Sequence, residues 1–158
     1  MNYLRSRLAN EKVGVIGVSL GGAAALLAQP KLNADAMVVE MVFSTLHRAI
    51  TNRMEMWFGG FGESLTPLLC WQLQPRLGID EASVCPVDRV GQVTAPLFVI
   101  GCSEDQHTKL EETQQLFAAA RSPKQLWVIN GASHVDPHSF ARAEYEQRVL
   151  EFFAHYLK

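Results

Sequence analysis

The feature that most constrains the fold is the apolar run from Val13 to Val18, which leads directly into a small-residue segment, "LGGAAALLA", from Leu20 to Ala28. The run contains no charge and no polar alternation, which is typical of a strand covered by helices on both faces of a parallel sheet. The segment after it has helical character, and Pro30 is expected to end that helix. A buried strand that passes at once into a helix predicts an α/β fold.

The same alternation continues along the chain. Apolar runs recur at 36–43 ("AMVVEMVF"), 95–101 ("APLFVIG") and 125–130 ("QLWVIN"), and helices are predicted over 109–122 and 141–157. Strands that alternate with helices predict one parallel sheet with flanking helices. No linker or internal repeat interrupts the chain, so residues 1–158 are interpreted as a single domain.

Two segments lie outside this alternation. Residues 3–10 are interpreted as the end of a helix, and 44–93 form a long region with two short helices, "LHRAITNRMEMWF" and "LTPLLCWQL". The long region carries Trp57, Trp71 and several Met and Phe residues.

The composition excludes several classes of partner. A formal charge of -2 over 158 residues provides no basic field for a nucleic-acid backbone, so a small neutral or apolar molecule is the expected substrate. The N-terminal stretch has no apolar core of signal-peptide length, and no run reaches the roughly 18 residues of a membrane span. We therefore expect a cytoplasmic protein that binds neither nucleic acid nor membrane.

The spacing of the cysteines matches no metal-binding motif, which argues against a metal site. Cys70, Cys85 and Cys102 lie in different segments, are odd in number and show no paired spacing with each other or with histidines. We expect reduced, mostly buried thiols, and neither a metal ion nor a cofactor.

The junction of the first strand and helix carries a serine between glycines, in the pattern G-x-S-x-G from Gly17 to Gly21. A sharp turn between a strand and a helix forces the hydroxyl of Ser19 out of the packed sheet, and glycines leave room for the neighbouring backbone. The backbone N–H of Leu20 would then lie at the positive end of the helix, where it can donate to an oxyanion. The pattern predicts Ser19 as a nucleophile.

Two other readings of this turn remain open. Ser19 could be a helix N-cap after a glycine-rich turn, or the turn could hold a phosphate at the helix N-terminus. No G-K-[ST] follows, and the glycines do not fit G-x-G-x-x-G, which argues against nucleotide binding.

A serine nucleophile needs a base, and the base needs an acid that holds its tautomer. Asp105 follows the third predicted strand in "VIGCSEDQHT", and His134 follows the fourth in "VINGASHVD". The carboxyl ends of parallel strands meet at one edge of the sheet, which places both residues on the side of Ser19. The order Ser19, Asp105, His134 is the order that hydrolase chemistry uses on such a sheet.

Each assignment has a rival. Asp105 could be a turn residue or a helix cap, and Glu104 is a neighbouring carboxylate. His107 and His138 compete with His134. We favour Asp105 because its shorter side chain suits a fixed imidazole contact, and His134 because His107 lies too near the acid and His138 already enters the region of the last helix.

Glu40 is a further carboxylate, placed inside the apolar strand 36–43. Burial of an unpaired carboxylate is costly, so Glu40 is either a second acid of the site or a structural carboxylate with a partner. The sequence favours the structural role.

Four stretches, "GVSLGG", "VTAPLFVIG", "GCSEDQHT" and "GASHVD", resemble the nucleophile elbow, acid-bearing strand, acid loop and histidine loop of the α/β-hydrolase superfamily. The resemblance runs from Val13 to the C-terminus and is closest to the serine-aminopeptidase-like and esterase-like branch. It implies serine hydrolysis of an ester, thioester or amide, with Ser19 as nucleophile, Asp105 as acid and His134 as base. It also implies that residues 44–93 form a helical cap insertion, whose Trp, Met and Phe residues would either make an apolar acyl pocket or belong to the core.

The chain departs from the complete pattern of this superfamily. Complete members begin with several strands before the elbow, and a loop among them supplies the second oxyanion N–H. We therefore expect the C-terminal half of the fold, truncated at its N-terminal side and slow as a catalyst. The alternatives are a catalytically silent hydrolase that acts as a binding or assembly module, and an α/β domain that holds an anion at Ser19.

The missing strands also predict an association. The strand from Val13 to Val18 would have one open edge, and it carries no Lys or Pro that would protect this edge. We expect a homo-oligomer that forms through this exposed edge.

Overall fold

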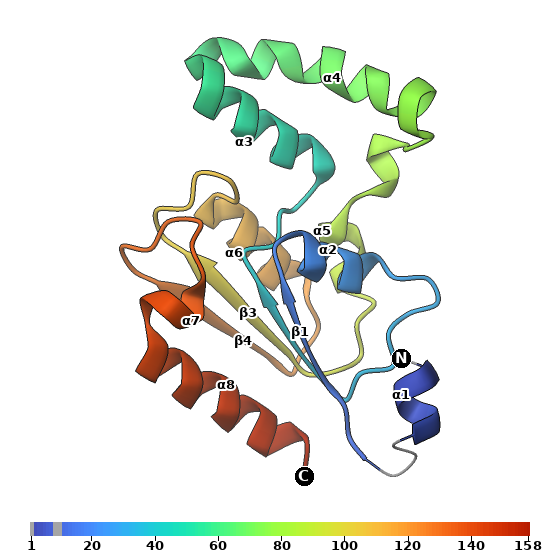
Figure 1. The fold of residues 1–158 in the computed structure, drawn as a ribbon, viewed down its shortest axis with the longest axis vertical. Coiled ribbons are helices and arrows are strands. Elements are labelled where there is room, and N and C mark those ends of the chain that lie inside the picture. The colour runs from blue at the N-terminus through green and yellow to red at the C-terminus, as the bar shows by residue number, and fades with distance from the viewer. Residues whose placement is uncertain (1, 8–10) are drawn as a thin grey trace.

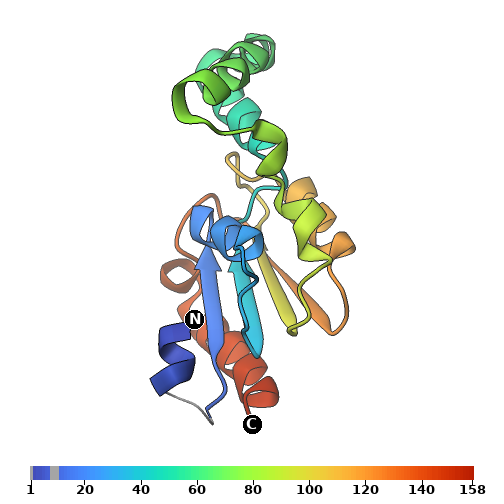
Figure 2. The same ribbon diagram turned by 90° about the vertical axis from the view of Figure 1, so that its right-hand side faces the viewer.

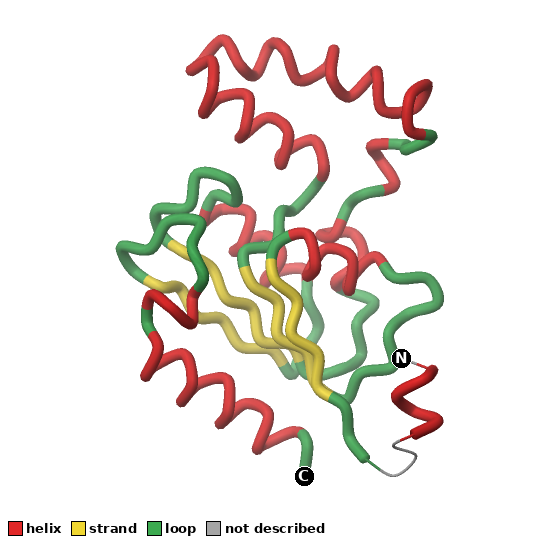
Figure 3. The backbone as a smooth tube through the Cα atoms, viewed as in Figure 1, coloured by secondary structure: helices red, strands yellow, loops and turns green. Residues whose placement is uncertain are grey.

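The computed structural model describes residues 2–7 and 11–158, and within them it contains one four-stranded sheet. The strands are all parallel and lie side by side in chain order (Figures 1 and 3). They are β1 (Gly14–Val18), β2 (Ala36–Glu40), β3 (Leu97–Cys102) and β4 (Lys124–Ile129). The predicted parallel sheet with flanking helices is confirmed.

Some element boundaries differ from the prediction. The apolar run 36–43 is a strand only as far as Glu40, because Met41 adopts a left-handed φ of 49° that ends the extended backbone. The first helix, α1 (Asn2–Arg7), is tied to the sheet layer by an ion pair of 2.6 Å between Arg5 and Asp35. Residues 8–10 of the predicted helix lie outside the described residues.

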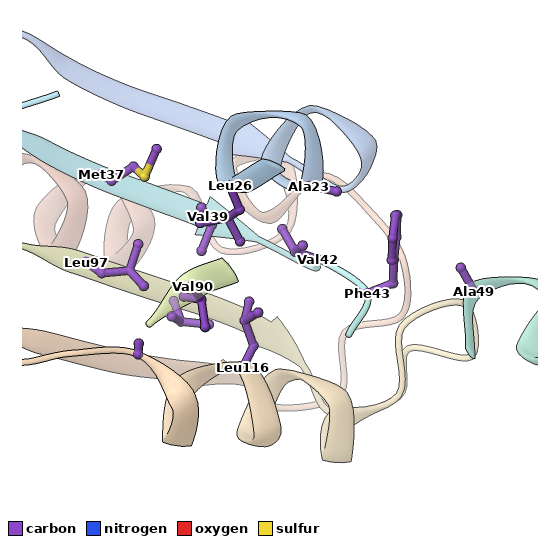
Figure 4. Close-up of a cluster of buried hydrophobic side chains, with 12 residues drawn as sticks. Ala23, Leu26, Met37, Val39, Val42, Phe43, Ala49, Val90, Leu97 and Leu116 are labelled. Carbon is purple, nitrogen blue, oxygen red and sulfur yellow. The ribbon is translucent and has the colours of Figure 1, made fainter. Parts of the chain in front are cut away.

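One face of the sheet is covered by three helices, α2 (Leu20–Leu27), α5 (Pro86–Val90) and α6 (Leu110–Ala119). Leu26, Val39, Val90, Leu97 and Leu116 meet in this layer and are buried (Figure 4). The side chains come from all three helices and from the two central strands. α2 follows the turn after β1, and α6 follows the loop after β3. Because both helices pack on this one apolar layer, the turn and the loop are held in place relative to each other.

The opposite face is covered by α8 (Arg142–Tyr156), which follows the short helix α7 (Pro137–Phe140). Phe98 of β3 packs on Phe152 of α8 with ring centroids 5.4 Å apart, and Trp127 of β4 lies in the same cluster. Glu40, at the end of β2, is 1% exposed and accepts a hydrogen bond of 2.6 Å from the Tyr145 hydroxyl. The carboxylate thus has a structural partner.

β1 is an edge strand of the described sheet and pairs with β2 alone. Its side chains divide between the two faces: Val15 packs against the cluster under α2, whereas Ile16 and Val18 are 49% and 46% exposed. α8 covers the middle of the second face and leaves these two apolar side chains open. The exposed part of β1 is therefore apolar both along its edge and on one face.

Residues 44–93, predicted as a cap insertion, divide between two places. α3 (Leu46–Phe58) and α4 (Gly62–Leu77), here called the cap helices, project beyond the carboxyl ends of the strands (Figures 1 and 2). The short helices η1 (Gly59–Phe61) and η2 (Glu81–Ser83) follow α3 and α4, whereas α5 returns to the sheet layer.

Local sequence explains the shape of the cap helices. The Thr45 side chain accepts a hydrogen bond from Arg48 N and caps α3, and left-handed glycines, Gly59 and Gly78, lie at the ends of α3 and α4. A Cβ at Gly62 would collide with Met54 O, so this glycine lets α4 start directly on α3. In the described part of the chain, no helix combines the length and apolar character needed to cross a bilayer.

Candidate active site

Ser19 lies at a sharp turn between β1 and α2, with φ 47° and ψ -115°. A non-glycine residue in this region of backbone conformation is strained and is held by its surroundings. Two backbone hydrogen bonds hold it: Ser19 N donates to Glu40 O at 2.7 Å, and Ala23 N donates to Ser19 O at 3.0 Å. The turn is therefore braced by β2 on one side and by α2 on the other.

The glycines that the turn needs for space are Gly17 and Gly22. A Cβ at Gly17 would lie 2.7 Å from the Cα of Gly22, and a Cβ at Gly22 would collide with Val42. A Cβ at Gly21 would meet nothing within 4 Å. The sequence argument about close backbone approach thus applies to Gly17, but the second close contact is one residue later than the G-x-S-x-G pattern suggests.

The backbone N–H of Leu20 is the first of α2, so it has no acceptor within the helix. The Leu20 side chain is 71% exposed, which places this residue at the surface of the turn. The partial positive charge of the helix N-terminus favours an anion here. Leu20 N–H is therefore available to an oxyanion formed next to Ser19.

The loops after β3 and β4 bring Asp105 and His134 together. Asp105 Oδ2 lies 2.6 Å from His134 Nδ1, and the Asp105 side chain is fully buried. The other carboxylate oxygen, Oδ1, accepts hydrogen bonds from the backbone N–H groups of His107 at 2.7 Å and Thr108 at 2.9 Å. With Nδ1 held by the carboxylate, the Nε2 atom of His134 is left to act as a base.

The rival residues occupy other environments. Glu104 is exposed, and His138 Nε2 is bonded to Glu146 at 2.9 Å. His107 lies beside the pair, with its ring centroid 4.8 Å from that of His134. Burial, followed by the proximity of His134, lowers the pKa of His107.

Ser19 stands at the carboxyl end of β1, on the edge of the sheet that carries both loops (Figure 3). Within the described residues, no hydrogen bond joins Ser19 to His134, while the contact between His134 and Asp105 is formed. Catalytic hydrogen bonds of hydrolases are often long before substrate binds and tighten in the complex. The structure thus brings two of the three predicted side chains into contact and places the third on the same edge.

A pocket of about 350 Å³ opens beside Ser19 and Leu20. Its other lining residues come from the loop after β2, from α3 and from the segment after α4: Phe43, Leu46, Ala49, Ile50, Arg53, Ile79 and Val84. Apart from Arg53, the lining is apolar and suits a hydrocarbon group. Sequence reasoning predicted an apolar pocket made by the Trp, Met and Phe residues of 44–93, but none of these lines this pocket; Trp57 and Trp71 are 70% and 71% exposed and line other pockets. It also did not identify Arg53, which has no special signal in the chain.

The donor atoms of Asp105, His107 and His134 lie within 4.8 Å of one another, so their types would suit a divalent cation. Asp105 and His134 already bond each other, however, and this bond is the one that a serine hydrolase requires. We therefore interpret the group as an acid–base pair with a neighbouring histidine.

Comparison with known proteins places this geometry in a known fold. No family model matches the chain. An uncharacterized protein of Bacillus subtilis, YqkD, is 24% identical over 143 residues, which are 89% of this chain and 47% of that protein.

Solved structures match almost the whole chain. The esterase Pf2001 of Pyrococcus furiosus superposes with a TM-score of 0.74 at 22% identity, covering 99% of this chain and 59% of that chain. The acylaminoacyl peptidase of Pyrococcus horikoshii gives a TM-score of 0.69 at 20% identity, with 99% and 26% covered. The α/β hydrolase GrgF of Penicillium gives 0.68 at 18% identity, with 99% and 69% covered.

These structures define the fold of the chain as that of an α/β hydrolase, and the predicted resemblance is confirmed at this level. The chain spans about half the length of the curated relative and a quarter to two thirds of the first solved structures. The described sheet therefore corresponds to part of the fold in these proteins.

Proposed function

We propose that the chain carries the nucleophile, base and acid of a serine hydrolase that cleaves a carboxylic ester, thioester or amide. The observation that carries the proposal is the contact of 2.6 Å between the buried Asp105 carboxylate and His134 Nδ1, at the edge of the sheet where Ser19 occupies its strained turn. The esterase and peptidase names of the structural neighbours support the same reaction class.

In the proposed reaction, His134 Nε2 takes the proton of the Ser19 hydroxyl as Oγ attacks the carbonyl carbon. Leu20 N–H donates to the oxyanion that forms. His134 then gives the proton to the leaving alcohol, thiol or amine, and an acyl group stays on Ser19. Water, deprotonated by His134, releases the acid and restores the hydroxyl, while Asp105 stabilises the charged imidazole in both steps.

The pocket beside Ser19 supports an apolar acyl group as the part of the substrate that the cap helices bind. Arg53 is the charged side chain of this pocket, and among the described residues no carboxylate lies within ion-pair distance of it. We propose a small molecule as substrate, with neither nucleic acid nor membrane as partner, and a cytoplasmic location.

A fluorophosphonate probe tests the proposal, because only an activated serine reacts with it. We expect the probe to label the peptide that contains Ser19, and we expect the label to vanish in Ser19→Ala. Ser64→Ala is the matched control, since Ser64 is an exposed serine of α4 outside the site. Labelling that persists in Ser19→Ala would move the nucleophile to another residue.

A second function, a catalytically silent binding module, is favoured by two observations. Within the described residues, Ser19 has no hydrogen bond to His134, and Leu20 N–H is the one oxyanion donor that the turn itself offers. Loss of a single oxyanion donor lowers kcat by roughly 10² to 10³-fold in known hydrolases. A wild-type chain that is folded but stays unlabelled by the probe would support this second function.

A further inference from the structure

Three side chains of types that can ligate a metal ion meet in the cap, away from Ser19, Asp105 and His134. His47 comes from α3, Cys70 from α4 and Glu81 from η2. His47 Nδ1 lies 2.6 Å from Glu81 Oε1 and 3.9 Å from Cys70 Sγ, and all three donor atoms lie within 4.8 Å of one another. Residues 23 and 34 positions apart from His47 are thus brought to one point by the tertiary structure.

The donor set has the chemistry of a zinc site. A thiolate, an imidazole and a carboxylate are all regular ligands of Zn²⁺, and the sulfur selects against the hard cations Mg²⁺ and Ca²⁺. Zn²⁺ bonds of about 2.0 to 2.3 Å in a tetrahedron place donor atoms roughly 3.3 to 3.6 Å apart. The observed distances of 2.6 and 3.9 Å fall on either side of this range, so small side-chain movements would bring all three onto one ion.

The exposure of the three side chains suits an ion that solvent can reach. Cys70 is buried, whereas the side chains of His47 and Glu81 are 49% and 27% exposed. The three residues line one pocket of about 580 Å³, together with Trp71, Asp80 and others. Three protein ligands on the wall of an open pocket leave the fourth position of a tetrahedral ion to water or to a ligand from solution.

We propose that His47, Cys70 and Glu81 bind one zinc ion that joins α3, α4 and η2. The ion replaces the proton of the Cys70 thiol, which leaves to solvent. Spacing along the chain gave no sign of this site, because its ligands are far apart in sequence. The proposal is independent of the hydrolase function, since none of its ligands belongs to the triad.

The site would also act on the pocket beside Ser19. Ile79 lines both pockets, and it stands two residues before the ligand Glu81. An ion that holds Glu81 against α3 would therefore also restrain a segment that lines the pocket beside Ser19.

The experiment uses the full chain after treatment with a chelator. We expect one equivalent of Zn²⁺ to bind, measured by competition with a chromogenic chelator, and to raise the melting temperature, since an ion that binds only the folded state stabilises it. Co²⁺ in place of Zn²⁺ is expected to give the intense absorption of a cobalt–thiolate bond. That absorption distinguishes this site from Asp105, His107 and His134, which offer no sulfur.

Three variants decide the outcome. Cys70→Ala and His47→Ala are each expected to weaken Zn²⁺ binding more than about 100-fold, beyond the effect of losing an outer partner of a metal ligand. Cys85→Ala is the matched control and is expected to bind as the wild type does, because Cys85 lies at the N-cap of α5. Circular dichroism checks that each variant is folded, and His47 is exposed enough for its replacement to leave the fold intact.

Two results would overturn the proposal. The first is a folded wild-type chain that binds no Zn²⁺ or gives no cobalt–thiolate absorption, which would leave only the hydrogen bond between His47 and Glu81. The second is equal binding by wild type and Cys70→Ala, which would move the ion to another set of ligands.

Discussion

Glu112 is expected to be the main polar support of the cap, and Glu112→Ala tests this directly. The side chain lies in α6, is 4% exposed and accepts hydrogen bonds from Ser44 N, Ser44 Oγ and Asn52 Nδ2 at 2.9, 2.9 and 2.6 Å. Ser44 begins the connection to the cap helices, and Asn52 lies within α3. One buried carboxylate thus joins α6 to both the start and the body of the cap.

The expected loss follows from the donors that Glu112→Ala leaves behind. The Ser44 hydroxyl can rotate to another acceptor, but the buried N–H groups of Ser44 N and Asn52 Nδ2 lose a partner, at about 1–3 kcal/mol each. The part-buried Lys109 N, which donates to Glu112 at 3.3 Å, loses its acceptor as well. Relief from burying a carboxylate offsets part of this, which leaves an expected loss of about 3 kcal/mol in the free energy of unfolding. Urea unfolding followed by circular dichroism measures the difference.

Glu111→Ala is the matched control, because Glu111 is the preceding residue of the same helix and is exposed. Its replacement is expected to change the free energy of unfolding by less than about 0.5 kcal/mol. If the two variants lost the same stability, the hydrogen bonds to Glu112 would contribute nothing measurable, and the reasoning would be refuted.

Three further predictions concern the site, a buried carboxylate and the sheet edge. Asp105→Asn is expected to lower any ester hydrolysis by about 10⁴-fold, as loss of the acid does in other triads, whereas the control Glu104→Gln is expected to leave the rate unchanged. A stopped assay with p-nitrophenyl esters compares the two variants, and equal rates would remove Asp105 from the mechanism. Burial raises the pKa of Glu40 in the folded chain above its value in the unfolded chain. Protonation of Glu40 therefore stabilises the folded chain at pH values below the unfolded pKa, and this contribution is lost as the pH rises through the folded pKa. Glu40→Gln is expected to stabilise the chain at pH 7 but not at pH 4, which thermal unfolding at both pH values tests. If the open edge of β1 mediates self-association, Ile16→Lys is expected to shift the chain toward monomer, whereas Leu150→Lys, an exposed control on α8, is not. Light scattering measures the oligomeric state, and a wild-type chain that is already monomeric at micromolar concentration would contradict the premise.

The choice of Ile16 for this last test came from the tertiary structure. Pattern alone cannot tell which side chains of a short apolar strand face the core, since Val15 and Ile16 have the same character. Packing under α2 turns Val15 inward and leaves Ile16 exposed. A lysine at Val15 would test folding, whereas a lysine at Ile16 tests association.

Much of the framework could be predicted from local sequence. Unbroken apolar runs, glycines at turns and helical segments between them are short-range signals, and they identified the parallel sheet and the turn at Ser19. The order of the strands also predicted that the loops carrying Asp105 and His134 share one edge, and the structure places the two side chains in contact there. Their catalytic roles stay predictions.

The tertiary structure alone decided the contacts between residues distant in the chain. Glu112 with Ser44 and Asn52, and His47 with Glu81, are brought together by the position of α3 beyond the carboxyl ends of the strands and beside η2, not by any pattern in the sequence. The physical reason is that periodicity and turn chemistry act over a few residues, whereas the partner of a buried polar group is chosen by the packing of whole elements. The sequence by itself therefore determined the strands and helices, and it determined that the site lies at the carboxyl ends of the strands. The packing of the cap helices decided which side chains support the site and which line its pocket.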